Sequence, residues 1–321
     1  MRARRQLGTE GPHVGAVGLG CMGMSWVYSS QRQDEKTSTR ALHDAIDLGV
    51  TLLDTADIYG PFSNESLLAR VVTDRRDEIT LATKGGLVGR VRETIGDVTV
   101  TADGRPEHLR AACDASLRRL GVDHIDLYYL HRVDPAVPLA ESWGALADLE
   151  RAGKIGHLGI CEVTVQQLSE AHAIAPVTAV QSEMSLWTRD PVAEVVPWCL
   201  DNGVAFVPFS PLGRGVFADR FADEGPPAED FRARMPRFTP EALAQNRRLV
   251  DVVREVALQH DATPGQVALA WTLAQGPHVI PIPGSTSTAH IAENARAATI
   301  RLDQAALQEL DDLPSAVGTR Y

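Results

Sequence analysis

The sequence has few cysteines and no excess of positive charge. Its 321 residues include 4 cysteines, Cys21, Cys113, Cys161 and Cys199, which lie far apart and form no Cys-x-x-Cys pair. This spacing indicates neither a zinc site nor a disulfide framework, and we expect no bound metal. The formal net charge is -11. Because nothing would offset phosphate repulsion at this charge, we expect no nucleic-acid partner.

Long hydrophobic runs are also missing. No segment reaches the roughly 20 apolar residues of a membrane-spanning helix, and the glycine-rich stretch after Arg5 lacks the apolar run of a secretory signal. We therefore expect a cytoplasmic protein without a membrane partner. Hydrophobic residues nevertheless make up 44% of the chain, which is enough for a large buried core. We predict that residues 1–321 form a single domain.

Short β-favouring runs alternate with helix-period segments along most of the chain. Strands are expected near residues 15–18, 51–54, 79–83, 125–130, 156–160, 178–181, 204–208 and 278–282. Helices are expected near residues 36–49, 63–73, 106–120, 138–152, 164–174, 190–202, 240–259, 264–275, 288–298 and 303–312. The Gly-x-Gly-x-x-Gly match at residues 18–23 lacks the chain position of a dinucleotide-binding unit and the acidic partner expected after its second strand, so a doubly wound open sheet is disfavoured. We predict an α/β fold, a (β/α)8 TIM barrel with additional C-terminal helices.

One segment, residues 209–240, interrupts this alternation. It is rich in glycine and proline and shows little periodicity. A loop of this length in a compact domain is usually functional or mobile. We predict a long loop after strand 7 that forms a flexible flap over the barrel mouth.

Four ionisable residues follow three of the expected strands. Asp54 and Tyr59 follow one apolar run. Lys84 ends a second run, and His131 ends a third. Because loops diverge and ligands bind at the carboxyl ends of parallel strands, these side chains are expected to converge on one catalytic site.

This set suits proton donation to a substrate. A phenol has an ordinary pKa of about 10, too high to share its proton easily at neutral pH. We expect the Lys84 ammonium to lower the pKa of Tyr59, and Asp54 to hold Lys84 charged. His131 is expected to hydrogen-bond the phenol and to orient a substrate carbonyl. The alternative interpretation is a surface phenol beside a purely structural Asp54–Lys84 ion pair.

Six segments carry a resemblance to a known family. They are DTADIYG (54–60), ATKGG (82–86), YYLHRVD (128–134), RAGKIGHLGI (151–160), SPLGRG (210–215) and IPIPGSTSTAHIAEN (280–294). They resemble the aldo-keto reductase superfamily over nearly the whole chain, and the sequence is most similar to bacterial members related to pyridoxal reductases and potassium-channel β-subunits. The resemblance implies an NADPH-dependent oxidoreductase of the alcohol dehydrogenase or carbonyl reductase type. Its implied catalytic set is Asp54, Tyr59, Lys84 and His131, with Tyr59 donating the proton.

The resemblance also implies a dinucleotide extended across the barrel mouth. The residues expected to contact it are Gln181, Ser210, Leu212, Gly213, Arg214, Gly215, Gly284, Ser285, Thr286, Glu293 and Asn294. The substrate is expected to be a small carbonyl compound in a pocket walled by aromatic residues. Candidates for this wall are Met24, Trp26, Tyr28, Trp187 and Phe231, of which we select Trp26.

Three positions depart from the pattern of many relatives. Thr286 and Ser287 stand where a cation often grips the 2'-phosphate of NADPH, so NADH is expected to be tolerated although NADPH is preferred. Cys161 replaces a hydroxyl that would hold the carboxamide of the cofactor. Met184 replaces an aromatic ring that would stack on the nicotinamide. Together these changes predict weaker cofactor binding.

Two other classes of function compete with the reductase. One is a regulatory or binding subunit that keeps the barrel and holds the cofactor with little turnover, which the departures at Cys161 and Met184 favour. The other is a metal-dependent barrel lyase or isomerase, but Lys84 and Tyr59 are poor metal ligands. The sequence identifies neither the physiological carbonyl nor the oligomeric state.

Overall fold

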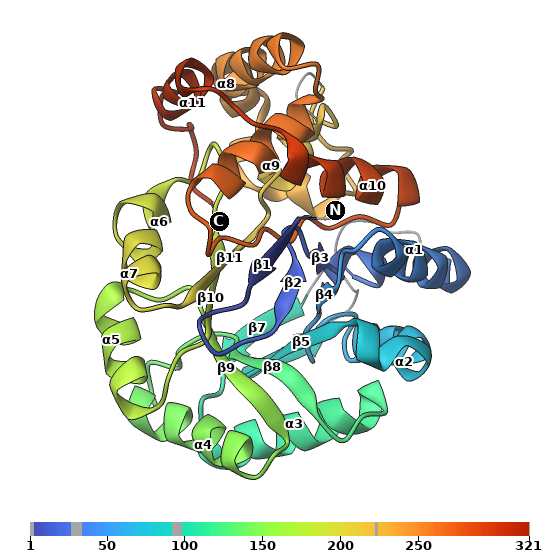
Figure 1. Ribbon diagram of the computed structural model, residues 1–321, viewed down its shortest axis with the longest axis vertical. Coiled ribbons are helices and arrows are strands. Elements are labelled where there is room, and N and C mark those ends of the chain that lie inside the picture. The colour runs from blue at the N-terminus through green and yellow to red at the C-terminus, as the bar shows by residue number, and fades with distance from the viewer. Residues whose placement is uncertain (1–2, 27–33, 92–97, 222–223, 321) are drawn as a thin grey trace.

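A ring of parallel strands forms the centre of the molecule, with helices outside it (Figure 1). The computed structural model describes residues 3–26, 34–91, 98–221 and 224–320. Its largest sheet has the order β11-β10-β9-β8-β5-β4-β3, and all neighbouring strands are parallel. These strands are β3 (Leu19–Gly20), β4 (Leu52–Asp54), β5 (Thr80–Gly85), β8 (Ile125–Leu130), β9 (Ile155–Cys161), β10 (Ala179–Glu183) and β11 (Ala205–Phe209).

Residues 278–284 close the ring between β11 and β3. The N–H groups of Ile280 and Ile282 donate to carbonyls of β11 at 2.8 and 3.0 Å. The Pro281 carbonyl accepts from the N–H of Gly18, and the Pro283 carbonyl accepts from the N–H of Gly20 in β3. Because proline has no N–H to return such bonds, this segment makes only part of a regular ladder although it lies where the eighth strand is predicted. The predicted (β/α)8 barrel is confirmed.

The helices lie close to their predicted positions. They are α1 (Glu35–Asp47), α2 (Ser63–Arg75), α3 (Pro106–Leu120), α4 (Leu139–Arg151), α5 (Val165–Ile174), α6 (Asp190–Ala193), α7 (Val195–Asp201), α8 (Pro240–Gln259), α9 (Pro264–Ala274), α10 (Thr288–Arg296) and α11 (Gln304–Asp311). The single helix expected over 190–202 is broken into α6 and α7, because Pro197 has no N–H to continue the helical ladder. Among the described residues, no helix is both long and apolar enough to span a bilayer.

Two of these helices show why the boundaries are readable from the sequence. α3 starts with Pro106 and ends at Gly121, whose φ of 70° is the left-handed value that glycine adopts without strain. α9 starts with Pro264 behind a capping box, in which Thr263 and Gln266 bond each other's backbone N–H groups. Local sequence signals therefore coincide with these helix ends.

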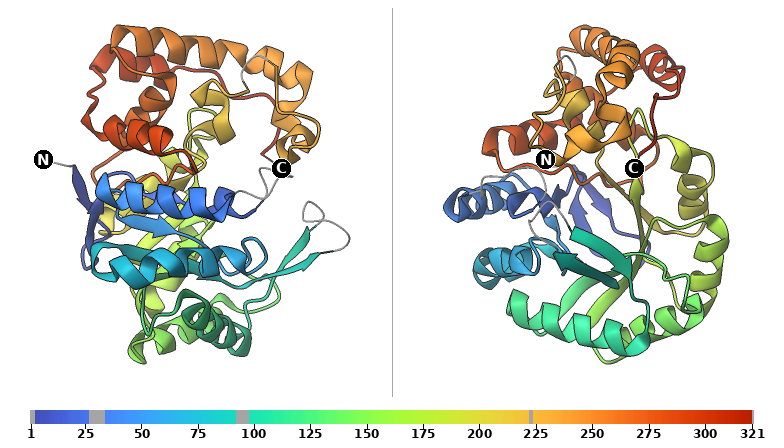
Figure 2. Two further views of the ribbon diagram at one scale, coloured as in Figure 1. Left: turned by 90° about the vertical axis from the view of Figure 1, so that its right-hand side faces the viewer. Right: turned by 180° about the vertical axis from the view of Figure 1, so that it is seen from behind.

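Two antiparallel hairpins are absent from the sequence-based prediction. β1 (Arg4–Gln6) pairs with β2 (His13–Gly15), so the first barrel strand is β3 rather than residues 15–18. β6 (Leu87–Val91) pairs with β7 (Val98–Ala102) directly after β5 and extends away from the barrel (Figure 2). Figure 2 places this second hairpin and the C-terminus at the opposite end of the barrel from the N-terminus.

The long loop predicted after strand 7 is confirmed in segment 209–240, and side chains of its described part are packed rather than open. Its described part contains the 3-10 helices η3 (Gly213–Ala218), η4 (Phe231–Arg234) and η5 (Pro236–Phe238). Phe217 and Phe238 are buried and contact the Trp187 ring edge to face. Arg232 stacks over the Phe221 ring with its guanidinium 4.3 Å from the ring centre. Aromatic burial therefore orders a segment whose glycine and proline content suggested a loose loop.

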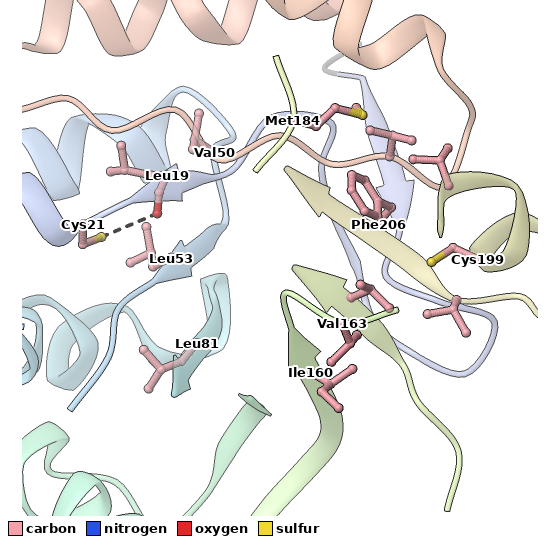
Figure 3. Packing of buried hydrophobic residues seen from close by; sticks show 14 of the residues in the cluster. Leu19, Cys21, Val50, Leu53, Leu81, Ile160, Val163, Met184, Cys199 and Phe206 are labelled. Atoms are coloured by element: carbon pink, nitrogen blue, oxygen red, sulfur yellow. Dashed lines mark hydrogen bonds between the residues drawn. The ribbon is translucent and has the colours of Figure 1, made fainter. Parts of the chain in front are cut away.

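Apolar side chains fill the space on both faces of the strands. One layer lies between strands and helices and includes Leu53, Leu81 and Phe206 (Figure 3). A second layer lies inside the barrel and includes Leu7 and Val14 from the N-terminal hairpin. Because side chains alternate along a strand, residues two positions apart enter the same layer. This alternation determines which residues reach the site described next.

Candidate active site

Four polar side chains form the last inward-facing layer at the carboxyl ends of the strands, here called the mouth. Each lies two positions after a residue of the inner apolar layer. The four pairs are Leu52 and Asp54, Ala82 and Lys84, Tyr129 and His131, and Ala179 and Gln181. The strand register therefore points all four into one small volume, as the sequence analysis expected for the first three.

Lys84 is the centre of this group and is 1% exposed. Its Nζ lies 2.5 Å from Asp54 Oδ1 and 2.8 Å from the carbonyl oxygen of Thr55. It also donates to the Tyr59 hydroxyl at 3.4 Å. Asp54 Oδ2 accepts from the Gln181 amide at 2.8 Å. Both carboxylate oxygens and the ammonium are therefore held by at least one partner each, which fixes the pair in the apolar interior.

The rings of His131 and Trp26 both contact the Tyr59 ring. The His131 ring meets it edge to face with centroids 5.9 Å apart, and the Trp26 ring lies 5.7 Å away. The backbone N–H of His131 donates to the Gly85 carbonyl at 2.8 Å. Within the described residues, His131 Nδ1 and Trp26 Nε1 are buried polar atoms without a hydrogen-bond partner. Such atoms are available to a molecule that enters the mouth.

Burial dominates the acid-base state of the site. It raises the pKa of Tyr59 to about 12, against the opposing pull of the Lys84 ammonium. The expected net lowering of this pKa is therefore wrong for the protein alone, although the expected effect of Lys84 has the right sign. Burial, together with the charges of Lys84 and Arg132, holds the pKa of His131 well below its usual range. At neutral pH the phenol is thus protonated and the imidazole is neutral.

The predicted cofactor residues other than Gln181 lie after β11, before α10 and within α10. After β11, the backbone has φ values of 50° at Ser210, 59° at Arg214 and 107° at Gly215. These left-handed values make a tight turn, a conformation in which successive N–H groups can face an anion. The Arg214 side chain is not open to solvent. It lies 2.9 Å from Glu183 Oε2 and donates to Met235 Sδ at 2.9 Å.

The start of α9 brings two distant cofactor segments together. A Cβ atom added at Gly265 would lie 3.7 Å from both Leu212 Cδ2 and Glu293 Oε1. Glu293 accepts from the Thr263 hydroxyl at 2.6 Å, and its neighbour Asn294 is buried. The loop after β11 and helix α10 therefore meet around a glycine that leaves space between them.

The remaining cofactor candidates precede α10. Gly284 forms a parallel bridge with Gly20, which seats this segment beside β3. The Ser285 hydroxyl accepts from the Ser287 N–H at 3.1 Å, and Thr286 lies in the same turn. Residues 210–215 follow β11 and residues 284–286 continue the closing segment 278–284 that pairs with it, so these two cofactor segments leave neighbouring parts of the ring.

Several aromatic and sulfur side chains are committed to packing. Met184 is completely buried in the layer between strands and helices (Figure 3), and Cys161 is buried inside the barrel. Trp187 is 4% exposed and enclosed by phenylalanines, so it does not wall an open pocket. Phe231 is partly buried at the start of η4, and Met24 is buried. Tyr28 lies outside the described residues.

The structure adds a cluster of charges that the sequence does not predict. Arg320 binds both carboxylate oxygens of Glu162 at 2.9 Å and reaches Glu183 Oε2 at 3.3 Å. Glu183 also accepts from Arg214 and from the Thr188 hydroxyl. Because Arg320 is 158 positions from Glu162, no local pattern could have paired them. The C-terminal tail thereby reaches the ends of β9 and β10.

The fold and this site define a class: a parallel α/β barrel with a lysine, a carboxylate, a phenol and an imidazole gathered at its mouth. A family model described as the Aldo/keto reductase family matches residues 16–314. The chain therefore belongs to the aldo-keto reductase family. Members are oxidoreductases that act on carbonyl compounds and generally use NAD(P)H.

Individual relatives agree with this assignment. The chain is 39% identical to a probable aldo-keto reductase of Glycine max over 98% of its own length and 91% of that protein. It is similar to a glycerol dehydrogenase structure from Gluconobacter oxydans, with a TM-score of 0.87, 26% identity, and coverage of 96% of this chain and 94% of that one. A holo aldo-keto reductase from Bacillus halodurans gives a TM-score of 0.79 at 26% identity, with coverage of 100% and 99%.

Proposed function

We propose that this protein is an NADPH-dependent reductase that converts an aldehyde or ketone to an alcohol, with Tyr59 as the proton donor. The observation that carries the proposal is the contact of one buried ammonium, Lys84, with both the Asp54 carboxylate and the Tyr59 hydroxyl. A solely structural ion pair would have no need of a phenol as a third partner at the mouth. When bound, the cofactor supplies the hydride.

The residues of the chain divide the remaining chemistry among them. Tyr59 is protonated at neutral pH and gives its proton to the carbonyl oxygen as negative charge develops there. Lys84 stabilises the phenolate that this leaves, because its positive charge lies one hydrogen bond away. Asp54 in turn keeps Lys84 charged. The neutral imidazole of His131 is placed to orient the substrate oxygen with the ring nitrogen that carries its proton.

The mouth has features that suit a dinucleotide. The left-handed turn at Ser210 and Gly213–Gly215 and the buried Arg214 guanidinium would face its phosphates. Leu212 belongs to the same phosphate-facing loop. Gly284, Ser285, Glu293 and Asn294 would line the adenosine half, and Gln181 would bind the nicotinamide amide. Thr286 offers a neutral hydroxyl to a 2'-phosphate, so the proposal is a preference for NADPH with NADH tolerated.

The proposal is tested by mixing the protein with NADPH, and separately with NADH, and a panel of aromatic aldehydes, ketones and pyridoxal. Loss of the reduced-nicotinamide absorbance is the expected result. Tyr59→Phe should lower kcat by about two to four orders of magnitude, the loss expected when a general acid is removed, and leave NADPH affinity near the wild-type value. Full activity of this variant would eliminate Tyr59 as the proton donor.

Tyr128→Phe is the matched control. Tyr128 is a completely buried phenol on β8, the strand that pairs with the Lys84 strand β5. Among the described residues its hydroxyl has no hydrogen-bond partner. Its loss should leave kcat close to that of the wild type, because it faces the outer apolar layer. Equal losses in both variants would point to packing rather than chemistry.

A second function, a regulatory or binding subunit with little turnover, is favoured by one observation. The ends of β9 and β10 are engaged by Arg320 and Arg214 through Glu162 and Glu183. NADPH binding without loss of absorbance with any panel member would support this function over the reductase.

A further inference from the structure

Asn64 is a completely buried residue in the first turn of α2. Its Oδ1 accepts from the Thr55 hydroxyl at 2.6 Å. Its Nδ2 donates to the Cys21 carbonyl at 3.0 Å and to the Ser25 hydroxyl at 2.7 Å. Its backbone N–H donates to the Tyr59 carbonyl at 3.2 Å. One residue therefore ties together three segments of the chain.

Each of these segments carries a part of the candidate active site. The Thr55 carbonyl accepts from Lys84 Nζ at 2.8 Å. The Cys21 N–H donates to the Asp54 carbonyl at 2.8 Å. Ser25 precedes Trp26, whose ring contacts Tyr59. Asn64 itself touches none of the groups that would meet a substrate.

The contact that depends most on this arrangement is the one between Lys84 and Tyr59. At 3.4 Å it is the longest of the three bonds that the ammonium makes. Good hydrogen bonds between nitrogen and oxygen lie at about 2.7 to 3.2 Å, so a further outward shift of the Tyr59 turn by a few tenths of an ångström would break it. The turn that carries Tyr59 is closed at its far end by the Asn64 N–H.

An amide is the side chain that fits this position. It offers one acceptor and two donors, and Asn64 uses all three at once. An aspartate would place an oxygen against the Cys21 carbonyl, and a leucine would leave buried groups unpaired. We propose that Asn64 is a positioning residue that holds Tyr59 within reach of Lys84 by linking the β4 end, the Cys21–Ser25 turn and the Tyr59 turn. This inference rests on the proposed reductase function.

The test compares Asn64→Leu with Thr55→Val, which removes the donor to Asn64 Oδ1 without touching Asn64. Both should lower kcat, Asn64→Leu by about 10- to 100-fold, the scale of a 1 Å misplacement, with carbonyl KM and NADPH affinity near wild type. The solvent deuterium isotope effect on kcat should increase, because proton transfer from a displaced phenol becomes slower. Thr55→Ser keeps the hydroxyl and should restore most of the rate lost in Thr55→Val.

Ser142→Ala is the control for a structural effect. Ser142 lies on the outer helix α4 and is buried, as Asn64 is. Its hydroxyl donates to the Gly104 carbonyl at 2.6 Å. It should lower thermal stability without altering kcat or the isotope effect. A wild-type kcat and isotope effect in folded Asn64→Leu would overturn the inference, as would equal kinetic losses in Ser142→Ala. If Asn64→Leu does not fold, the Thr55 pair decides by the same two measurements.

Failure of the proposed function gives a different result. In that case the wild-type protein turns over no carbonyl, and the inference is tested by crystal structures of wild type and Thr55→Val. An increase in the distance between Lys84 Nζ and Tyr59 Oη in the variant supports the positioning role. An unchanged distance overturns it.

Discussion

The two sides of the barrel mouth are built in different ways. The strand side carries Asp54, Lys84 and His131, whose positions follow from the alternation of side chains along β4, β5 and β8. The loop side comprises residues 210–215 and 284–286 together with residues 293–294 of α10, and it is held by contacts between segments far apart in the sequence. A register can be read from local pattern, whereas loop contacts depend on the finished fold. We therefore expect the strand side to be a rigid chemical centre. On the loop side, we expect the ion pair of Arg214 with Glu183 to change partners when the cofactor binds.

Lys84→Met should show the largest effect, because it removes the centre of the strand side. The Asp54 carboxylate would remain buried with Gln181 as a partner but without a cation. We expect kcat to fall at least about 10³-fold, and the free energy of unfolding to fall by about 3 to 5 kcal/mol. Carbonyl reduction at saturating NADPH and urea unfolding measure the two quantities.

The double variant Asp54→Asn with Lys84→Met separates these two effects. Replacing both charges removes the unpaired carboxylate, so part of the stability should return. Activity should not return, since the phenol still lacks its neighbouring cation. If the single variant kept a rate within tenfold of the wild type, the idea of a rigid strand-side centre would have to be abandoned.

Arg214→Gln tests the loop side and should have a smaller effect on chemistry. Arg214 is paired with the buried Glu183, and the proposal requires it to face phosphate when the cofactor binds. We expect NADPH affinity to fall about tenfold, which corresponds to losing one charge-assisted contact, while kcat at saturating NADPH stays near that of the wild type. Fluorescence titration with NADPH at several salt concentrations measures the affinity, whose salt dependence should weaken.

A surface arginine provides the comparison for this variant. Arg105 pairs with Asp103, and its side chain is 59% exposed. Arg105→Gln should leave both NADPH affinity and its salt dependence unchanged. Equal affinities for wild type and Arg214→Gln would show that the pair with Glu183 is permanent and that other groups hold the phosphates.

The same contrast explains how much the sequence could reveal. Capping residues and apolar periodicity determine the helix ends, and Asp54, Lys84 and His131 follow apolar runs directly, so both were predictable. The pairing of Arg320 with Glu162 was not, because it joins positions brought together only by the complete barrel. The packing of aromatic residues in segment 209–240 was missed because they are buried without helical or strand periodicity.

The pKa of Tyr59 was also misjudged for a physical reason. The Lys84 charge is visible in the sequence, but the depth of burial that outweighs it is not.

The contacts of Asn64 were also not visible in the sequence. Asn64 lies in the first turn of α2, five residues after Tyr59, and only the fold shows that its amide meets Thr55, Cys21 and Ser25.

The smallest expected effect concerns Asp57, a buried carboxylate on the strand side. Among the described residues its Oδ1 has no hydrogen-bond partner. Burial, and then the Glu65 charge, raises its pKa to about 7. The folded state therefore keeps a proton that the unfolded chain loses at about pH 4, so the free energy of unfolding should fall between about pH 4 and 7. Asp57→Asn should remove this loss and be more stable than the wild type at pH 8 by about 4 kcal/mol, because one pKa unit corresponds to about 1.4 kcal/mol.

Urea unfolding at pH 4 and pH 8 provides the test, with Asp201→Asn as the control. Asp201 is exposed at the end of α7, so its substitution should change stability little at either pH. For Asp57→Asn the gain should be small at pH 4, where the wild-type carboxyl is already protonated in the folded state, and large at pH 8. A gain that does not vary with pH would mean that Asp57 ionises freely, and the strand side would then be less closed to water than its buried charges indicate.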